Sequence, residues 1–157
     1  MKKPIIVFFL LLQQLSYSQK VVSYKNIGVI FSEKYDCYLF TNFKRFTPNQ
    51  DEINQFETLL NKNIQNININ KFKPLIHENL NNYNRQYIGI FNEKGEKIIH
   101  INFFWREDEN QPFFNKIKYD KWKTEWFEIQ DGGSYYWNIK YNLIHNTFFD
   151  FRVNSHG

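Results

Sequence analysis

Cysteine, glycine and proline are all scarce in this sequence. The chain of 157 residues holds a single cysteine, Cys37, so an internal disulfide is excluded. We interpret Cys37 as a buried thiol rather than a nucleophile, because the sequence does not place a histidine or another general base next to it. The six glycines and four prolines form no linker-like stretch, and no internal repeat is evident. A chain of this length without a linker predicts a single domain.

The spacing of the histidines excludes the common metal-binding motifs. None of the four forms a His-x-x-x-His or Glu-x-x-His pair, and there is no second cysteine; they are His77, His100, His145 and His156. Ser134 follows Asp-Gly-Gly and does not fit a nucleophile elbow, Gly-x-Ser-x-Gly. We therefore assign no catalytic residue, no metal ligand and no cofactor, and we favour a protein that is not an enzyme.

Positive charges exceed negative charges only slightly in this sequence. Twenty Lys and Arg residues stand against 16 Asp and Glu residues, which gives a formal net charge of +4. Lys2 and Lys3 belong to a segment that we expect to be removed, so the mature chain carries about +2. So small a charge does not indicate nucleic acid or an anionic membrane as a partner.

The first 18 residues are typical of a secretory signal peptide. Positive charges precede a short apolar stretch over residues 5–12, and small residues precede a cut ahead of Gln19. The apolar stretch is too short to span a bilayer as a stable helix. We therefore predict an exported protein, periplasmic or secreted, with no membrane span after cleavage and with residues 19–157 as its one domain.

Residues 47–64 carry a clear helix signal. Thr47, Pro48 and Gln50 fit an N-cap, a first helical position and a capping box. Apolar residues follow at helical spacing and give the helix one apolar face; they are Ile53, Phe56, Leu60 and Ile64. Residues 74–82 predict a second, short helix.

Runs rich in aromatic and β-branched residues predict strands. Residues 85–91 and 97–105 flank an Asn-Glu-Lys-Gly turn and predict a hairpin. The second of these strands alternates apolar residues with polar ones, so we expect its polar His100 and Asn102 to lie on the exposed face of the sheet. Residues 21–31 predict one further strand, straight or bent.

The last third of the chain predicts three more strands, over residues 121–130, 135–141 and 147–153. Asp131-Gly-Gly-Ser134 is a strong hairpin turn, because its glycines accept positive φ without steric cost. A three-residue loop here places Phe127 and Ile129 in the core and Trp126 outside. A two-residue loop reverses them, and we prefer the first arrangement because Phe127 and Ile129 are the better matched core pair.

The final hairpin depends on its loop for register. If Tyr141 pairs with Thr147, then Asn138 lies opposite Asp150. This register assigns one set of alternating residues to the core: Tyr135, Trp137, Ile139, Phe149, Phe151 and Val153. The opposite set lies on the outer face of the sheet.

Together these elements predict an α+β domain in which an amphipathic helix and a short second helix pack on a four- to five-stranded antiparallel meander sheet. The order of strand, helix and antiparallel strands resembles cystatin-like folds, although the sequence lacks their Gln-x-Val-x-Gly inhibitor loop. The run Asp-Gly-Gly-Ser-Tyr-Tyr-Trp-Asn-Ile-Lys-Tyr-Asn, with the signal peptide, is similar to short exported bacterial proteins of unknown function. That resemblance implies export and brings no activity with it.

Aromatic side chains stand among polar ones on the outer face of the predicted sheet. Flat rings of this kind give a large contact area at low entropy cost, and they suit a peptide, protein or glycan ligand. The candidate binding residues are Trp126, Tyr136, Asn138, Phe148, Asp150, Arg152 and His100. In the alternative interpretation, the second helix or the loop over 106–120 covers these rings, or they form ordinary cross-strand pairs.

We therefore expect an exported, non-enzymatic binding protein, either an inhibitor or immunity-type module or an envelope accessory factor. Its expected partner is a protein, peptide or glycan of the cell envelope or outside the cell. The alternative is a small hydrolase or ligand-binding protein with a pocket that uses His100 with Asp150 or Glu128. A third hypothesis is an assembly subunit that associates through the edge of the sheet.

Overall fold

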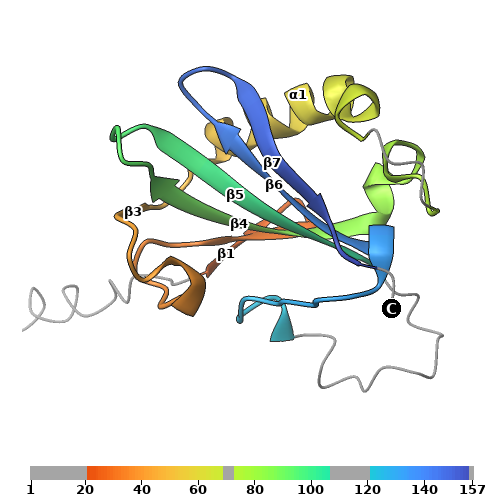
Figure 1. Cartoon of the computed structure of the whole chain (residues 1–157). Coiled ribbons are helices and arrows are strands. Elements are labelled where there is room, and N and C mark those ends of the chain that lie inside the picture. The colour runs from red at the N-terminus through yellow and green to blue at the C-terminus, as the bar shows by residue number, and fades with distance from the viewer. Residues whose placement is uncertain (1–20, 69–72, 107–120, 156–157) are drawn as a thin grey trace, which may run out of the picture.

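The computed structural model describes residues 21–68, 73–106 and 121–155. The predicted signal peptide over 1–18 and most of the predicted loop over 106–120 lie outside the described residues. The described residues form a twisted sheet with one long helix against it (Figure 1). The predicted α+β class is therefore confirmed.

The sheet has seven strands, more than the four to five predicted. The order is β1-β2-β4-β5-β6-β7, and β3 pairs with β4 beyond the end of β2. Every pairing is antiparallel except that of β2 with β4. The strands are β1 Val21–Tyr24, β2 Gly28–Phe31, β3 Arg45–Phe46, β4 Tyr83–Phe91, β5 Lys97–Trp105, β6 Tyr136–Asn142 and β7 Thr147–Val153.

A tight turn explains part of the difference in strand count. The stretch predicted as one strand folds back on itself as the β1–β2 hairpin. Lys25 and Asn26 both have positive φ, 44° and 57°, as the central residues of a type I′ turn do, and the Ile27 amide closes this turn on the Tyr24 carbonyl at 3.0 Å. The chain then returns to the sheet parallel to β2, as β4, after the long connection that contains the helix.

The long helix α1, Gln50–Ile67, begins two residues later than the start signal predicted. Its N-cap is Asn49, whose side chain accepts from the Glu52 amide in a reciprocal capping box. Thr47 serves a different segment, because its hydroxyl accepts a hydrogen bond from the Glu33 amide at 3.0 Å. The predicted apolar face is confirmed; its buried members are Ile53, Phe56, Leu60 and Ile64.

Short 3₁₀ turns replace two of the other predicted elements. The second helix is two such turns, η2 Ile76–Glu78 and η3 Leu80–Asn82. The Asp131-Gly-Gly stretch leads into a further turn, η4 Gly133–Tyr135. A fourth, η1 Tyr38–Phe40, follows Cys37.

The β4–β5 hairpin is confirmed with its turn. Tyr83 pairs with Trp105 at one end and Phe91 with Lys97 at the other, so the ladder is unbroken. Gly95 lies in the turn with φ 77°.

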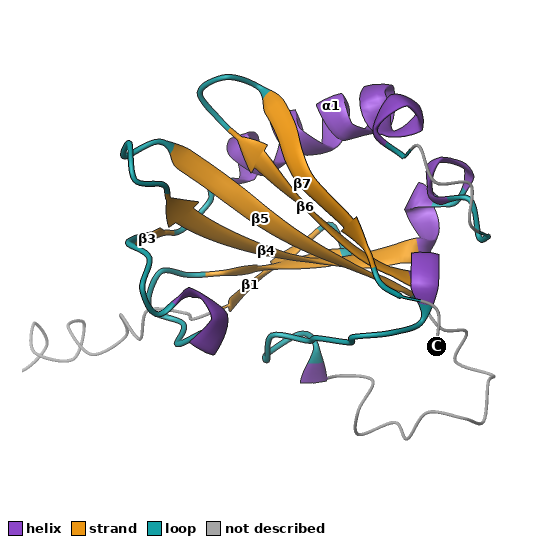
Figure 2. Ribbon diagram, in the orientation of Figure 1, coloured by secondary structure: helices purple, strands orange, loops and turns teal. Residues whose placement is uncertain are grey.

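Segments of the chain lie against both sides of the sheet (Figure 2). We call the side that packs on α1 the inner face and the opposite side the outer face. The inner core combines the apolar face of α1 with rings from β4, β5 and β6 such as Tyr87, Phe103 and Trp137. A second core on the outer face combines apolar residues of β2, β4 and β5 with Cys37, Phe40 and Trp122.

The predicted strand over 121–130 is wrong. Described residues 121–131 contain no strand and run instead across the outer face; we call them the strap. The Gln86 side chain explains this path, because it donates to the Trp122 and Glu125 carbonyls and accepts from the Phe127 amide. The side-chain amide of Gln86 thus forms hydrogen bonds with backbone groups of residues 121–131 that would otherwise pair with a neighbouring strand. The choice between two- and three-residue loops at Asp131 therefore does not arise.

Candidate functional site

The outer face is covered over one half of the sheet and open over the other. Over β2, β4 and β5, the η1 segment and the strap bury an apolar cluster. Over β6 and β7 the outward side chains are only partly covered. We call this open part the β6–β7 strip; it consists of Asn138, Lys140, Phe149, Asp150 and Arg152.

Most of the predicted site residues come together at this strip. Asn138 pairs with Arg152 across β6 and β7, and His100 pairs with Lys140 across β5 and β6. The Trp126 ring lies 5.7 Å from the His100 ring, measured between centroids. The structure thus assembles Asn138, Asp150, Arg152, His100 and Trp126 around one corner of the outer face.

Phe148 and Tyr136 lie elsewhere. The placement of Phe148 on the outer face is wrong, because its ring packs on the inner side at 5.9 Å from Phe56 and 5.0 Å from Tyr141. The hairpin pairs Asn142 with Thr147, one residue away from the predicted register, and such a slip moves a side chain to the other face. Tyr136 does lie on the outer side, but at the start of β6, where it packs against the covered cluster.

A β-bulge further along β7 returns the side chains to their predicted faces but shifts the register by a second residue, so Asn138 lies opposite Arg152 and not opposite Asp150 as predicted. The ladder shifts between Asn138 and Lys140, and Asp150 takes up the extra residue with φ 53°. Phe151 therefore packs on the inner core as predicted, whereas Phe149 does not. Phe149 was assigned to the core, but it is 43% exposed on the strip.

The bulge concentrates charge on the strip. Lys140 Nζ lies 2.7 Å from Asp150 Oδ2, and Arg152 Nε lies 2.6 Å from Asp150 Oδ1. Partial burial raises the pKa of Asp150, but the hydrogen bonds from Lys140 and Arg152 outweigh it and lower the pKa below its usual value. Asp150 is therefore ionised at neutral pH, and the three side chains carry one net positive charge.

His100 lies at the border between the strip and the covered cluster. Its ring is 5.1 Å from that of Phe40, measured between centroids, and 5.7 Å from that of Trp126. Burial, reinforced by the nearby charge of Lys140, lowers the pKa of His100 from 6.5 to about 3. The imidazole is therefore neutral at physiological pH. Within the described residues, its Nδ1 has no hydrogen-bond partner.

The two carboxylates proposed as partners of His100 have other roles. Both oxygens of Asp150 are held by Lys140 and Arg152. Glu128 accepts a hydrogen bond from the hydroxyl of Tyr38, and that bond raises the pKa of Tyr38 to about 12. Cys37 is confirmed as a buried thiol, and its burial raises its pKa.

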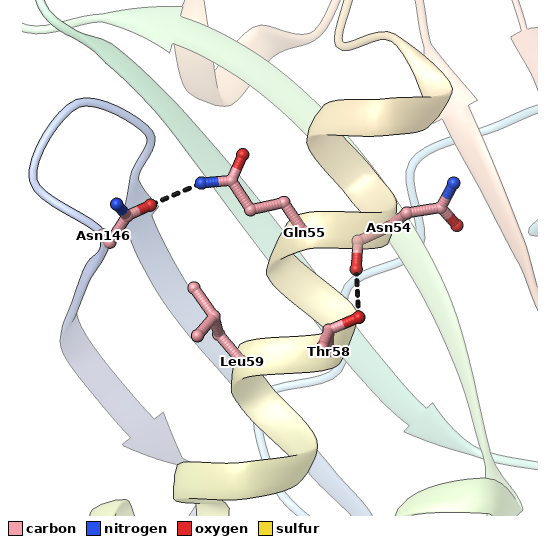
Figure 3. Close-up of a pocket in the computed structure, with 5 residues that line it drawn as sticks. All are labelled: Asn54, Gln55, Thr58, Leu59 and Asn146. Atoms are coloured by element: carbon pink, nitrogen blue, oxygen red, sulfur yellow. Dashed lines mark hydrogen bonds between the residues drawn. The ribbon is translucent and has the colours of Figure 1, made fainter.

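A hollow of about 400 Å³ lies on α1 beside the β6–β7 loop (Figure 3). Its lining is neutral and consists of Asn54, Gln55, Thr58, Leu59 and Asn146. Gln55 Nε2 donates to Asn146 Oδ1 at 2.5 Å, and Tyr141 donates to the same oxygen at 2.7 Å. These hydrogen bonds join the helix to the loop, so we interpret the hollow as a structural joint.

Nothing in the described ranges offers a metal centre or a membrane helix. No group of three or more His, Cys, Asp or Glu side chains is placed to hold an ion among them. Likewise, no helix in that part of the chain has the length and apolar character to cross a membrane. Comparison with protein-family models, curated proteins and solved structures found no match. The assignment of the candidate site therefore rests on the geometry of the described residues.

Two residues of the strip were missed as site residues by the sequence argument. Lys140 lies on the same strand face as Asn138, and that alternation alone could have included it. Phe149 could not have been found, because its orientation depends on the register of the β6–β7 hairpin, which differs by one residue from the predicted one and which no local signal marks.

Proposed function

We propose that the protein is an exported, non-enzymatic binding module that engages its partner through the β6–β7 strip. The proposed partner is a protein of the cell envelope or of the medium outside the cell. Inhibition or immunity by occlusion of that partner fits a small domain with one open face.

The exposure of Phe149 carries this proposal. A phenylalanine ring 43% exposed on a strand, beside Lys140 and Arg152, combines an apolar contact with charged groups at its margin. Protein interfaces commonly have this composition, with an aromatic anchor and a polar rim. Among the described residues, the strap and the η1 segment cover the outer face over β2, β4 and β5, and the strip beside them is open to a partner.

The alternative is a pocket-bearing hydrolase or ligand-binding protein that uses His100. Its one supporting observation is a neutral imidazole with an unbonded Nδ1 in the described structure. The rings of Phe40 and Trp126 lie against that imidazole, and Asp150 and Glu128 are bonded to other side chains. The binding module is therefore the better supported function.

Affinity capture with matched variants tests the proposal. The mature chain from Gln19 is immobilised and exposed to cell-envelope extract and to culture medium. The strip variant Phe149→Ala/Arg152→Ala is used beside it, together with the control variant Ile144→Ala. Ile144 is 59% exposed on the β6–β7 loop and lies outside the strip, so it controls for general loss of surface hydrophobicity.

We expect a protein that is retained by the native chain and by Ile144→Ala but is lost from the strip variant. Near-UV circular dichroism checks that both variants are folded. Equal retention by all three chains would contradict the strip as the binding face. Turnover of an ester or peptide substrate that His100→Gln abolishes would favour the hydrolase instead.

A further inference from the structure

Asp150 uses both of its oxygens in ion pairs within the strip, whereas Arg152 uses only one of its three side-chain nitrogens. Asp150 has both oxygens occupied, one by Lys140 and one by Arg152. Arg152 uses only its Nε for this contact, and its side chain is 71% exposed. In the described part of the chain, the two terminal nitrogens of Arg152 have no hydrogen-bond partner. A planar pair of donors in this position matches the two oxygens of a carboxylate.

Asp150 holds this pair of donors in place. Its contact with Nε fixes the guanidinium at one edge, because the aspartate itself is held in the bulge with φ 53°. Lys140 is held by the other oxygen of the same carboxylate. A ligand thus meets two cations that are already positioned, and it loses less side-chain entropy than with two free surface chains.

An apolar contact lies directly beside these cations. Phe149 is the cross-strand partner of Lys140 and is 43% exposed. A ligand that brought a carboxylate to Arg152 would therefore place its neighbouring group against the Phe149 ring. Net positive charge on one side and an apolar ring on the other define the chemistry of the complementary ligand.

We propose that the strip binds an acidic segment of a partner protein, in which an Asp or Glu side chain lies next to an apolar one. The carboxylate forms a two-pronged contact with the terminal nitrogens of Arg152 and takes a further hydrogen bond from Lys140. The apolar side chain packs on Phe149. This inference rests on the proposed function and names the chemistry of its partner.

Selection from a displayed library of random peptides on the immobilised mature chain tests this inference. The selected peptides are synthesised, and their affinities are measured for the native chain, Arg152→Gln, Phe149→Ala and the control Lys44→Gln. Lys44 is a cation outside the strip, and its Nζ lies 5.2 Å from the centroid of the Phe91 ring. A charge swap completes the set: Arg152→Glu is tested with peptides in which the acidic residue is replaced by lysine.

We expect the peptides to share an acidic residue next to an apolar one. Arg152→Gln and Phe149→Ala should each lower the affinity about tenfold, and Lys44→Gln should leave it unchanged. The lysine-substituted peptides should bind Arg152→Glu better than they bind the native chain, a result that general unfolding cannot produce.

The two proposals fail in different ways. Peptides without an acidic residue that lose affinity for Phe149→Ala but not for Arg152→Gln would overturn the acidic ligand and leave the binding face intact. Selection of no peptide, or of peptides that bind all variants equally, would count against both. An acidic oligosaccharide that bound more tightly than any peptide, with the same dependence on Arg152, would replace the protein partner.

Discussion

A buried ion pair is the most consequential contact at the scale of single residues. Arg85 is 1% exposed, and its Nε lies 2.8 Å from Glu57 Oε1 in the inner core. The same oxygen accepts from the Tyr87 hydroxyl at 2.7 Å, and Arg85 also donates to the Tyr83 carbonyl at 2.6 Å. The network ties α1 to β4 without any role for the outer face.

Glu57→Gln should therefore destabilise the fold strongly. The substitution keeps the shape of the side chain but leaves the buried charge of Arg85 without compensation, which costs about 3 kcal/mol. Urea unfolding of the native and variant chains measures the difference. Glu125→Gln is the control, because its pair with Lys121 is exposed and should contribute less than about 0.5 kcal/mol. Equal effects of the two substitutions would contradict the assignment.

His100 should make the stability depend on pH. In the unfolded chain this histidine takes up a proton near pH 6.5, whereas in the folded chain its pKa is about 3. Between these values the unfolded state binds more protons, so the free energy of unfolding decreases as the pH falls, by up to about 1.4 kcal/mol per pH unit.

Urea unfolding between pH 7 and pH 4 measures this dependence, with His100→Gln for comparison. The variant should lose the part of the slope that the imidazole contributes, while the slope from the carboxylates remains in both chains. Parallel stability curves for the native chain and His100→Gln would show that His100 is protonated normally in the folded state.

The strap is an element held by side chains of the sheet. Gln86 is fully buried and binds three of the strap's backbone groups, and Asn102 donates to the Phe127 carbonyl at 2.5 Å. The strap in turn places Trp126 over His100. Two amide side chains thus decide which half of the outer face is covered.

Gln86→Leu should release the strap. The substitution leaves two carbonyls and one amide of the strap without their partner, at a cost of about 1 kcal/mol each. Hydrogen exchange of peptides from 121–131 should accelerate, and the midpoint of urea unfolding should fall. Gln65→Leu on the exposed side of α1 is the control and should change neither. Unaltered exchange in the strap after Gln86→Leu would contradict this role.

At the scale of the whole molecule, the two edge strands of the sheet, β1 and β7, differ in how they contact the rest of the fold. Among the described residues β7 pairs on one side only, and its bulge and its charged Asp150 and Arg152 are features that oppose pairing with a second sheet. We therefore do not favour assembly through β7. At the other end, β1 pairs with β2 and brings Tyr24 into the inner core.

The fold should consequently tolerate removal of the predicted signal peptide but not of β1. A chain that begins at Gln19 keeps Tyr24, which is 3% exposed and donates to Asn54 at 2.7 Å. A chain that begins at Lys25 loses that contact and the edge of the sheet, at a cost of about 3 kcal/mol or more. Thermal unfolding of the two chains measures the difference, and equal transition temperatures would contradict it. Mass spectrometry of the exported protein tests the cut ahead of Gln19.

Local patterns in the sequence determined the α+β class, the apolar face of α1 and the β4–β5 hairpin. Each of these depends on periodicity or turn chemistry within a few residues, such as the spacing from Ile53 to Ile64 or Gly95 in its turn. The alternation in β5 correctly placed His100 and Asn102 on the face opposite the inner core. The prediction that this face is exposed was wrong there, because the η1 segment and the strap pack over both residues.

Only the tertiary structure decided the path of the strap and the composition of the strip. The Asp131-Gly-Gly signal was real as a turn, but Gln86 and Asn102 captured the preceding backbone from strands far away in the sequence. The one-residue shift at the β6–β7 loop turned Phe149 to the outer face, and the bulge at Asp150 returned Phe151 to the inner face; neither has a local signal in the sequence. Side-chain capture and register both depend on groups distant in the chain, and for that reason a single sequence could not assign the open half of the outer face.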